Sequence, residues 1–382
     1  MPTRRQTLAL IGGGLIAAAG AAAYPVTRSP RTALAPWDMA GQYDDPRKRA
    51  LSWAILSPNP HNRQPWMVDL SVLGQIGLYV DTDRMLPHTD PFNRQITVGL
   101  GCFLETLTLA AAEEGLATRI DLFPDGTDDQ ALDARPVALI RLEEGGTPDP
   151  LFAQVPHRRT QKEPFDTTRP VPEEAVQDLT QSVAAHLPDN LRVAASVDPA
   201  SIARHRQISE EAMRVELETP HTYKESVDLF RIGHREVDAN PDGIDFTGPM
   251  FETLHLTGQF TREAALDRNS LAYTSGVDAV LENMRTAMGH IWLTSAGNTR
   301  ADQIAAGRAW TRLNLHCQRL GLGTQPLSQA LQEYPEMDAL YAEVHEMLAQ
   351  PGETVQMWAR IGYSPAVPPS PRWPLDAKLV DA

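Results

Sequence analysis

Residues 57–66 read SPNPHNRQPW, and this stretch decides how the first part of the chain folds. Each proline disfavours helix in the residue before it, so a helix that runs up to Leu56 must end here in an extended turn. The turn presents Asn62 and Gln64, two amides that each carry hydrogen-bond donors and an acceptor, beside the indole of Trp66. Such a surface suits a planar heterocycle with donors and acceptors on its rim. The alternative is a proline-rich loop closed by a buried tryptophan.

Length and composition narrow the class of protein. The chain has 382 residues, 42% hydrophobic and 22% charged, which is typical of a globular protein with one large or two ordinary domains. A net charge of −15 without a long basic run argues against nucleic-acid binding. Cys102 and Cys317 are too few for a disulfide framework, and we expect them to be small core residues. No Cys or His spacing suggests a metal site.

The first 23 residues have the order of an export signal. Arg4 and Arg5 precede an apolar run over 8–23 that ends in three alanines. The start resembles a twin-arginine signal, although Thr7 replaces the usual bulky apolar residue. We therefore expect a periplasmic or exported protein, and the alternative is an uncleaved membrane anchor. A dinucleotide-binding fingerprint at residues 12–14 is disfavoured because no β-strand pattern precedes it.

An internal repeat divides the rest of the chain. Apolar residues recur at helical spacing over 99–115 and again over 306–321. Gly101 and Gly115 have the same spacing as Gly307 and Gly321, and both segments continue as G-L-x-T. Two related halves fused in tandem explain this pattern, and chance similarity between two amphipathic helices is the alternative.

The remaining pattern gives the expected domain boundaries. We predict a first half over 24–150 and a second half over 151–382, with an insertion at about 198–299 that has no counterpart in the first half. The other regular elements expected are helices over 46–56, 199–217 and 277–294, and strands over 66–80, 119–123, 136–142 and 355–363. We also expect a lid or surface crossover around 240–251, and an extended proline-rich tail after residue 363 that does not pack.

A basic motif forms the second informative stretch. Arg158, Arg159, Thr160 and Lys162 place three cations and a hydroxyl within five residues. Guanidinium groups bind a phosphomonoester bidentately, and a hydroxyl donates to a further oxygen. The alternative is a solvated basic turn.

Together, S-P-x-x-x-N-x-Q-P-W and R-R-T-x-K resemble the signature of the FMN-dependent nitroreductase superfamily. The resemblance implies an α+β fold in which an antiparallel sheet is wrapped by helices. Members are generally homodimers with flavin at the subunit interface. Two fused halves would build that interface within one chain, so we expect a monomer that forms an intramolecular pseudo-dimer.

The resemblance also implies a site for one FMN per chain. Asn62 and Gln64 would contact the flavin ring and Lys162 the pyrimidine. Arg158, Thr160 and Arg372 would contact the phosphate. The segment around 328, where relatives supply a backbone N–H to flavin N5, lacks their usual Glu-Gly. The full set expected to bind the cofactor is Ser57, Asn62, Gln64, Arg158, Arg159, Thr160, Lys162, Ser328, Gln329 and Arg372. No side chain is expected to act directly in catalysis, since the flavin supplies the chemistry.

The implied activity is ping-pong transfer of a hydride or electrons. The donor would be NAD(P)H or another reductant, and the acceptor an electron-poor nitroaromatic or quinone. Because nicotinamide donors are cytoplasmic, export leaves an alternative: a protein that binds or sequesters flavin with little turnover. A specialised dehalogenase or flavin-fragmenting enzyme is a third interpretation.

Overall fold

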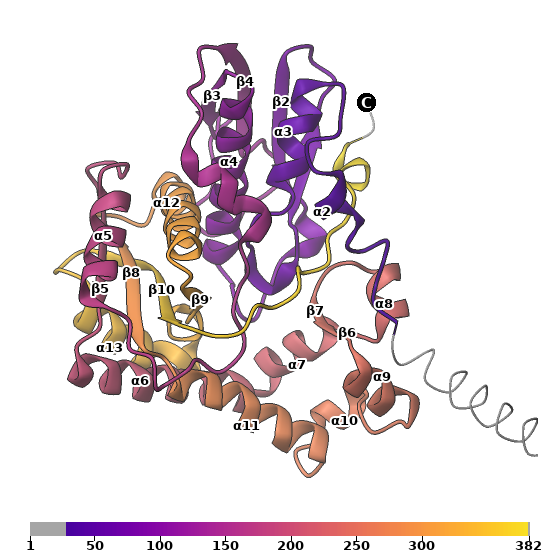
Figure 1. Ribbon diagram of the computed structural model, residues 1–382, viewed down its shortest axis with the longest axis vertical. Coiled ribbons are helices and arrows are strands. Elements are labelled where there is room, and N and C mark those ends of the chain that lie inside the picture. Colours follow the sequence, from indigo (N-terminus) through magenta and orange to yellow (C-terminus); the bar gives the residue numbers. More distant parts are fainter. Residues whose placement is uncertain (1–27, 381–382) are drawn as a thin grey trace, which may run out of the picture.

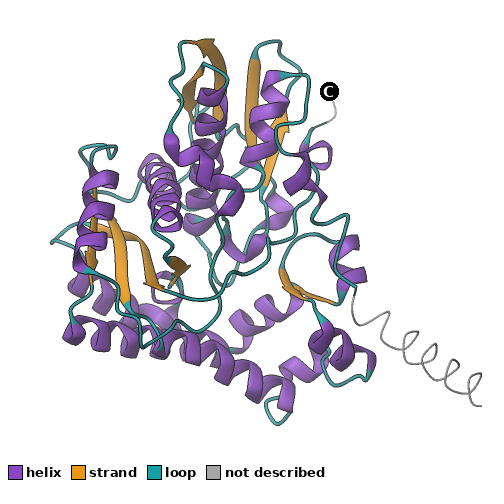
Figure 2. Ribbon diagram, in the orientation of Figure 1, coloured by secondary structure: helices purple, strands orange, loops and turns teal. Residues whose placement is uncertain are grey.

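In a computed structural model that describes residues 28–380, the chain forms two four-stranded sheets, each entirely antiparallel, and a small parallel β-ribbon (Figures 1 and 2). Helices pack between and around the sheets, so the predicted α+β class is confirmed. The expected signal peptide, residues 1–23, lies outside the described residues.

The two sheets have the same topology. Their strand orders are β1-β2-β4-β3 and β5-β8-β10-β9, which match strand for strand along the chain. The strands are β1 (Trp66–Asp69), β2 (Gln75–Val80), β3 (Leu116–Leu122), β4 (Ala138–Glu144), β5 (Leu191–Ser196), β8 (Gly289–Ser295), β9 (Gly323–Pro326) and β10 (Thr354–Gly362). The two halves of the chain therefore share one sheet topology, which is the arrangement expected of an intramolecular pseudo-dimer.

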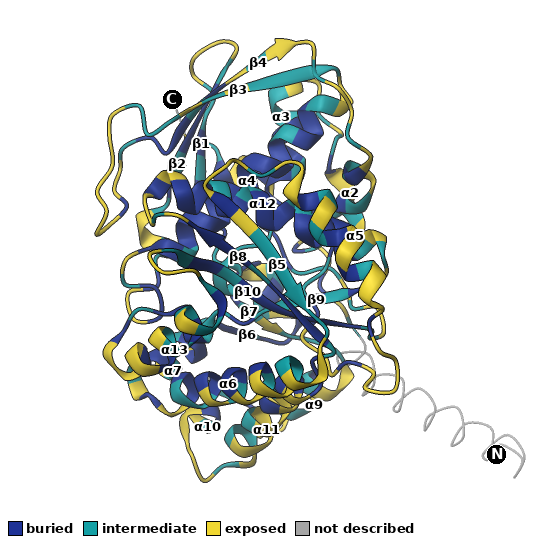
Figure 3. Ribbon diagram, turned by 90° about the vertical axis from the view of Figure 1, so that its left-hand side faces the viewer, coloured by how far each residue is buried: buried dark blue, intermediate teal, exposed yellow. Residues whose placement is uncertain are grey.

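The repeated helices form the centre of this pseudo-dimer. They are α4 (Arg94–Glu113) and α12 (Arg300–Arg319), and they lie side by side between the sheets (Figure 3). A Cβ atom at Gly101 would lie 2.2 Å from the carbonyl oxygen of Ile304, and one at Gly307 would lie 1.9 Å from that of Val98. The contacts are reciprocal, so the repeated glycines mark a local twofold axis where the helices touch.

A pair of arginines repeats the same symmetry. Arg94 and Arg300 begin α4 and α12, and both are buried. Arg94 reaches across to the carbonyls of Gln356 and Leu331 in the second half. Arg300 reaches back to carbonyls in the segment 128–129 of the first half. Each half thus donates hydrogen bonds from one buried guanidinium to backbone carbonyls of the other half.

Four further helices cover the halves. They are α2 (Ala35–Met39), α3 (Pro46–Ala54), α5 (Glu173–Ala184) and α13 (Asp338–Leu348), and α3 precedes β1 as α5 precedes β5. By length and composition α4 is the only described helix that could cross a membrane, but it is almost entirely buried in the protein core.

The insertion lies between β5 and β8, at 197–288. It contains α6 (Pro199–Glu218), α7 (Pro220–Asp228), β6 (Phe230–Ile232), α8 (His234–Ala239), β7 (Ile244–Phe246), α9 (Pro249–Leu256), α10 (Arg262–Leu266) and α11 (Leu271–Arg285). The helix expected over 277–294 is wrong beyond Arg285, because the next residues form central strand β8. A short apolar run fits a buried helix or a strand equally well, and here pairing with β5 and β10 decides it.

The proline-rich tail is extended but packed, which corrects the expectation of a free arm. It runs from the end of β10 across to the first half (Figure 1), where Leu375 and Lys378 are buried and Leu379 bridges to Val68. Proline prevents regular pairing but not burial, so composition alone was a poor guide here.

Candidate functional site

The turn at 57–66 adopts an unusual backbone. After α3 a short 3-10 segment, Pro60–Asn62, leads into β1. His61, Asn62 and Gln64 have φ values of 48°, 51° and 50°, in the left-handed region that residues with a Cβ rarely adopt. Strained backbone of this kind persists only where surrounding contacts fix it, and it concentrates at functional sites.

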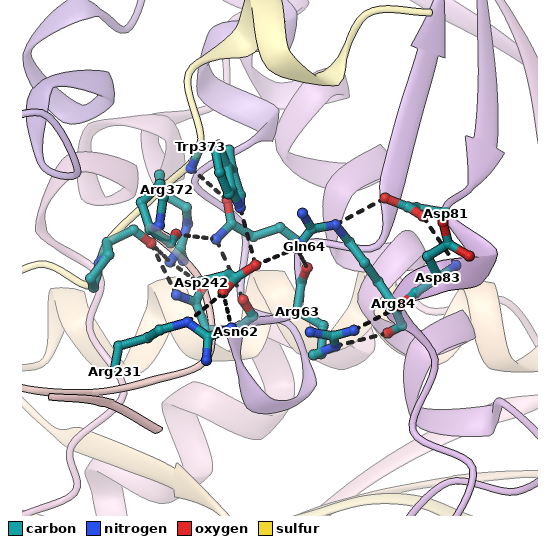
Figure 4. Close-up of polar contacts among 12 residues, drawn as sticks. Asn62, Arg63, Gln64, Asp81, Asp83, Arg84, Arg231, Asp242, Arg372 and Trp373 are labelled. Carbon is teal, nitrogen blue, oxygen red and sulfur yellow. Dashed lines mark hydrogen bonds and ion pairs between the residues drawn. The ribbon is translucent and has the colours of Figure 1, made fainter. Parts of the chain in front are cut away.

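The side chains of the turn are held by the protein itself. Ser57 is buried and donates a hydrogen bond of 2.7 Å to Thr106 of α4, so it anchors the turn. Gln64 is fully buried: its Nε2 donates to the carbonyl of Pro241 at 2.7 Å, and its Oε1 accepts from the backbone N–H of Trp373 at 2.9 Å (Figure 4). In this arrangement both polar atoms of the Gln64 amide are hydrogen-bonded within the protein, and its expected contact with a flavin ring stays a prediction.

The side chain of Asn62 is hydrogen-bonded to the proline-rich tail. Its Oδ1 accepts a hydrogen bond of 2.6 Å from Arg372 Nη1, and its Nδ2 donates to the carbonyl of Pro371. We expected Asn62 to serve the ring and Arg372 the phosphate. The structure instead joins the two residues.

Three arginines from two distant segments meet beside this turn. Arg158 follows the 3-10 segment Pro150–His157, and Arg372 comes from the tail. The carbonyl of Leu56 accepts from both, at 3.3 Å from Arg158 Nη2 and 3.1 Å from Arg372 Nη2. The ring of Trp37 lies against Arg159, at 4.6 Å, and against Arg372, at 5.7 Å. We call Arg158, Arg159 and Arg372 the arginine cluster.

The arginine cluster lacks carboxylate partners. None of the ion pairs formed within residues 28–380 includes any of its members. Three buried nitrogens, Arg158 Nη1, Arg159 Nε and Arg372 Nε, have no hydrogen-bond partner. Burial, with the charges of neighbouring arginines, lowers the pKa of Arg158 to about 10 and that of Arg372 to about 9. Buried cations with unpartnered nitrogens and no carboxylate bonded to them suit an anionic ligand.

Another basic stretch serves as a contrast. Arg47, Lys48 and Arg49 are paired with Asp45, Asp376 and Glu114 respectively, and Arg47 also donates to three carbonyls. These cations are satisfied within the protein. The charges of this stretch are therefore already neutralised by neighbouring carboxylates, unlike those of the arginine cluster.

The remaining predicted residues lie around the arginine cluster. Thr160 is partly exposed and Lys162 exposed, and the charge of Lys162 acts on His61 of the turn. Ser328 and Gln329 begin the 3-10 segment after β9. The backbone N–H of Gln161 donates to the carbonyl of Thr324 at 2.8 Å, which joins the basic motif to β9. Among the predicted residues that the structure describes, those of the turn and of the arginine cluster are joined by hydrogen bonds.

Two contributors were missed in the sequence. Arg360 of β10 is fully buried and donates to the carbonyls of Gln161 and Glu163, on either side of Lys162. The signal available in the sequence was the charge of Arg360 within the mostly apolar strand β10. Asp242 of the insertion contacts the turn region through Arg84 and Trp373 (Figure 4), and nothing local in the sequence marked it.

Comparison with known proteins gives distant relatives. No family model matches the chain. It is 24% identical over 351 residues to Putative NAD(P)H nitroreductase acg of Mycobacterium tuberculosis, covering 86% of this chain and 93% of that protein. It is 24% identical over 329 residues to Putative NAD(P)H nitroreductase Rv3131 of the same organism, covering 85% and 88%. These similarities extend over both halves, in agreement with the nitroreductase-like fold expected from the sequence.

Among solved structures, the chain is similar to the FMN-dependent nitroreductase NfnB of Mycobacterium smegmatis in complex with NADPH. The identity is 19%, the match covers 59% of this chain and 95% of that one, and the TM-score is 0.34.

Proposed function

We propose that this protein is an FMN-dependent oxidoreductase of nitroreductase type. The observation that carries the proposal is the arginine cluster, in which Arg158 and Arg372 are buried, Arg159 is half-buried, none forms an ion pair within the described residues, and each has one buried nitrogen without a hydrogen-bond partner there. The names of the similar mycobacterial proteins and the sequence resemblance favour the same class.

The arginine cluster fits the phosphate of FMN. A phosphomonoester carries nearly two negative charges and accepts hydrogen bonds at three oxygens, which matches three cations with one free N–H each. Thr160, two residues beyond Arg158, would add a hydroxyl donor. Asn62 would hold Arg372 in place through the bond to its Nη1.

At the ring end, the chain's own residues supply charge and orientation. Lys162 would stabilise the negative charge that a reduced flavin ring acquires near N1 and O2. Arg360 fixes the backbone on both sides of Lys162 and so directs that side chain. When bound, FMN supplies hydride or electron transfer between a donor such as NAD(P)H and an electron-poor acceptor.

The decisive experiment is purification followed by an absorbance spectrum and anaerobic mixing with NADPH or NADH. We expect a yellow protein whose oxidised-flavin absorbance bleaches on mixing and returns with a nitroaromatic or quinone. A yellow protein that does not bleach would favour the flavin-holding alternative. A colourless protein that does not bind added FMN would refute both.

We also propose one FMN per chain. The turn occurs only in the first half and the arginine cluster lies against it, while the other basic stretch, 47–49, is already paired. Flavin released by denaturation should therefore equal the protein concentration. Two flavins per chain would contradict the proposal.

Export through the twin-arginine pathway is a further proposal, supported by the order of residues 1–23. It would suit a protein that folds around a cofactor before crossing the membrane. Fractionation of cells that express the full chain tests it: replacing both Arg4 and Arg5 with lysine should retain the protein in the cytoplasm.

A further inference from the structure

One buried carboxylate joins three distant parts of the chain beside the proposed cofactor site. Asp242 of the insertion is 4% exposed. Its Oδ1 accepts from Arg231 at 2.7 and 3.1 Å, and its Oδ2 accepts from Arg84 of the first half at 2.5 Å. Oδ2 also accepts from the indole Nε1 of Trp373, in the tail, at 3.2 Å (Figure 4).

The backbone around Asp242 is fitted to the turn. Pro241 accepts the hydrogen bond from Gln64, and the backbone N–H of Gly243 donates to the carbonyl of Asn62 at 3.2 Å. Gly243 has φ of +71°, and a Cβ there would lie 2.2 Å from the carbonyl oxygen of Leu229. Glycine at position 243 therefore permits the close packing of this segment on Leu229 within the insertion, in the conformation that presents the Gly243 N–H to the turn.

The carboxylate is ionised at neutral pH. Burial favours its neutral form, but the hydrogen bond from Arg84 and the charge of Arg231 outweigh this and hold the pKa of Asp242 below its usual value. Its bonds to Arg84, Arg231 and Trp373 are thus charge-assisted, the stronger kind of hydrogen bond.

Asp242 acts on the arginine cluster through Trp373. The indole is held by Asp242, and the backbone N–H of the same residue is held by Gln64 Oε1. The preceding residue is Arg372, whose guanidinium bonds the carbonyls of Leu56 and Ser57. Asp242 of the insertion therefore holds Trp373, and Trp373 in turn places the preceding tail residue, Arg372, in the arginine cluster.

We propose that Asp242 is a positioning residue for phosphate recognition: by holding Trp373 it fixes Arg372 in the arginine cluster, so that the insertion controls how tightly the cofactor phosphate is bound. This inference rests on the proposed function, and it assigns the insertion a role at the proposed site. Asp242 itself does not touch the cofactor.

The test compares FMN with riboflavin, which lacks the phosphate. In Asp242→Asn the shape is kept but the charge is lost. We expect FMN to bind roughly tenfold more weakly, the effect of replacing a charge-assisted bond by a neutral one, and riboflavin affinity to change by less than about twofold. Trp373→Phe removes the indole N–H together with the five-membered ring that carries it, and should shift the FMN-to-riboflavin ratio in the same direction.

The control is Asp133→Asn, which removes the carboxylate of an exposed pair with Arg135 and should leave both affinities unchanged. Equal weakening of FMN and riboflavin would show a general structural role and overturn the inference, as would no change in either. If Asp242→Asn does not fold, the ratio of FMN affinity to riboflavin affinity in Trp373→Phe decides between these outcomes. Wild-type protein that does not distinguish FMN from riboflavin would refute the phosphate assignment itself, a separate failure.

Discussion

Replacing Arg158 with methionine should have opposite effects on the apoprotein and on cofactor binding. Methionine keeps most of the aliphatic volume and removes the guanidinium. The pKa of Arg158 falls from its usual value to about 10, chiefly by burial and then by the charge of Arg159. Holding this charge in the apoprotein therefore costs on the order of 3 kcal/mol.

The net effect on the apoprotein is smaller than this cost. The substitution also removes a hydrogen bond of 3.3 Å to Leu56, whose net contribution is about 1 kcal/mol. We expect the free energy of unfolding of apo Arg158→Met to rise by about 1–2 kcal/mol. FMN should bind more weakly by about 1.5–3 kcal/mol, or roughly 10- to 150-fold, because a buried charge-assisted bond to phosphate is lost.

Urea denaturation of apoprotein and FMN titration followed by flavin fluorescence measure the two quantities. Arg47→Met is the matched control: Arg47 is paired with Asp45 and donates to three carbonyls, so its loss should destabilise the protein and leave FMN affinity unchanged. Destabilised apo Arg158→Met with normal FMN affinity would refute the assignment of an anion site.

Three more predictions concern other positions. The tail residue Lys378 donates to the carbonyl of Gln64, and burial first, then the charge of Arg84, lowers its pKa to about 7. The unfolded lysine keeps its proton up to a higher pH than the folded one, so this group makes the free energy of unfolding rise as the pH increases from 7 to about 10. Lys378→Met should flatten that rise. Gly101→Ala should destabilise the protein by about 3 kcal/mol or more, because the added methyl meets backbone of α12. Gly276→Ala in α11, where nothing lies within 4 Å, should instead stabilise by up to about 1 kcal/mol in thermal unfolding.

The sequence predicted those parts of the fold that depend on local pattern. Gly101 and Gly307 were recognised as a repeat, and they mark the helix contact because only glycine permits it. Arg158 and Arg372 were placed together only through a family resemblance, since nothing in their own surroundings links them. Strand β8 was mistaken for helix because its apolar residues have no distinctive period when both faces are buried.

The site details that escaped prediction all involve contacts between distant segments. Gln64 carries the donor and acceptor expected of a ring ligand, but the insertion and the tail use both. Asp242 is one acidic residue among many until the fold brings Arg84, Arg231 and Trp373 to it. Local sequence shows what a side chain can bind, whereas the arrangement of the halves decides which partner it meets.

The pseudo-dimer also explains how a single site can be asymmetric. Identical subunits must carry both motifs, but two halves of one chain can diverge. On the side of the site, Thr106 of α4 receives the hydrogen bond from Ser57. The repeat that aligns Gly101 with Gly307 places Arg312 of α12 at the equivalent position, where Glu105 and Asp149 both pair with it. An anion approaching that side meets a cation already neutralised by two carboxylates, whereas the members of the arginine cluster on the other side form no ion pair within the described residues. On the proposed function, this difference in charge pairing, more than the difference in backbone, would direct the cofactor to one side.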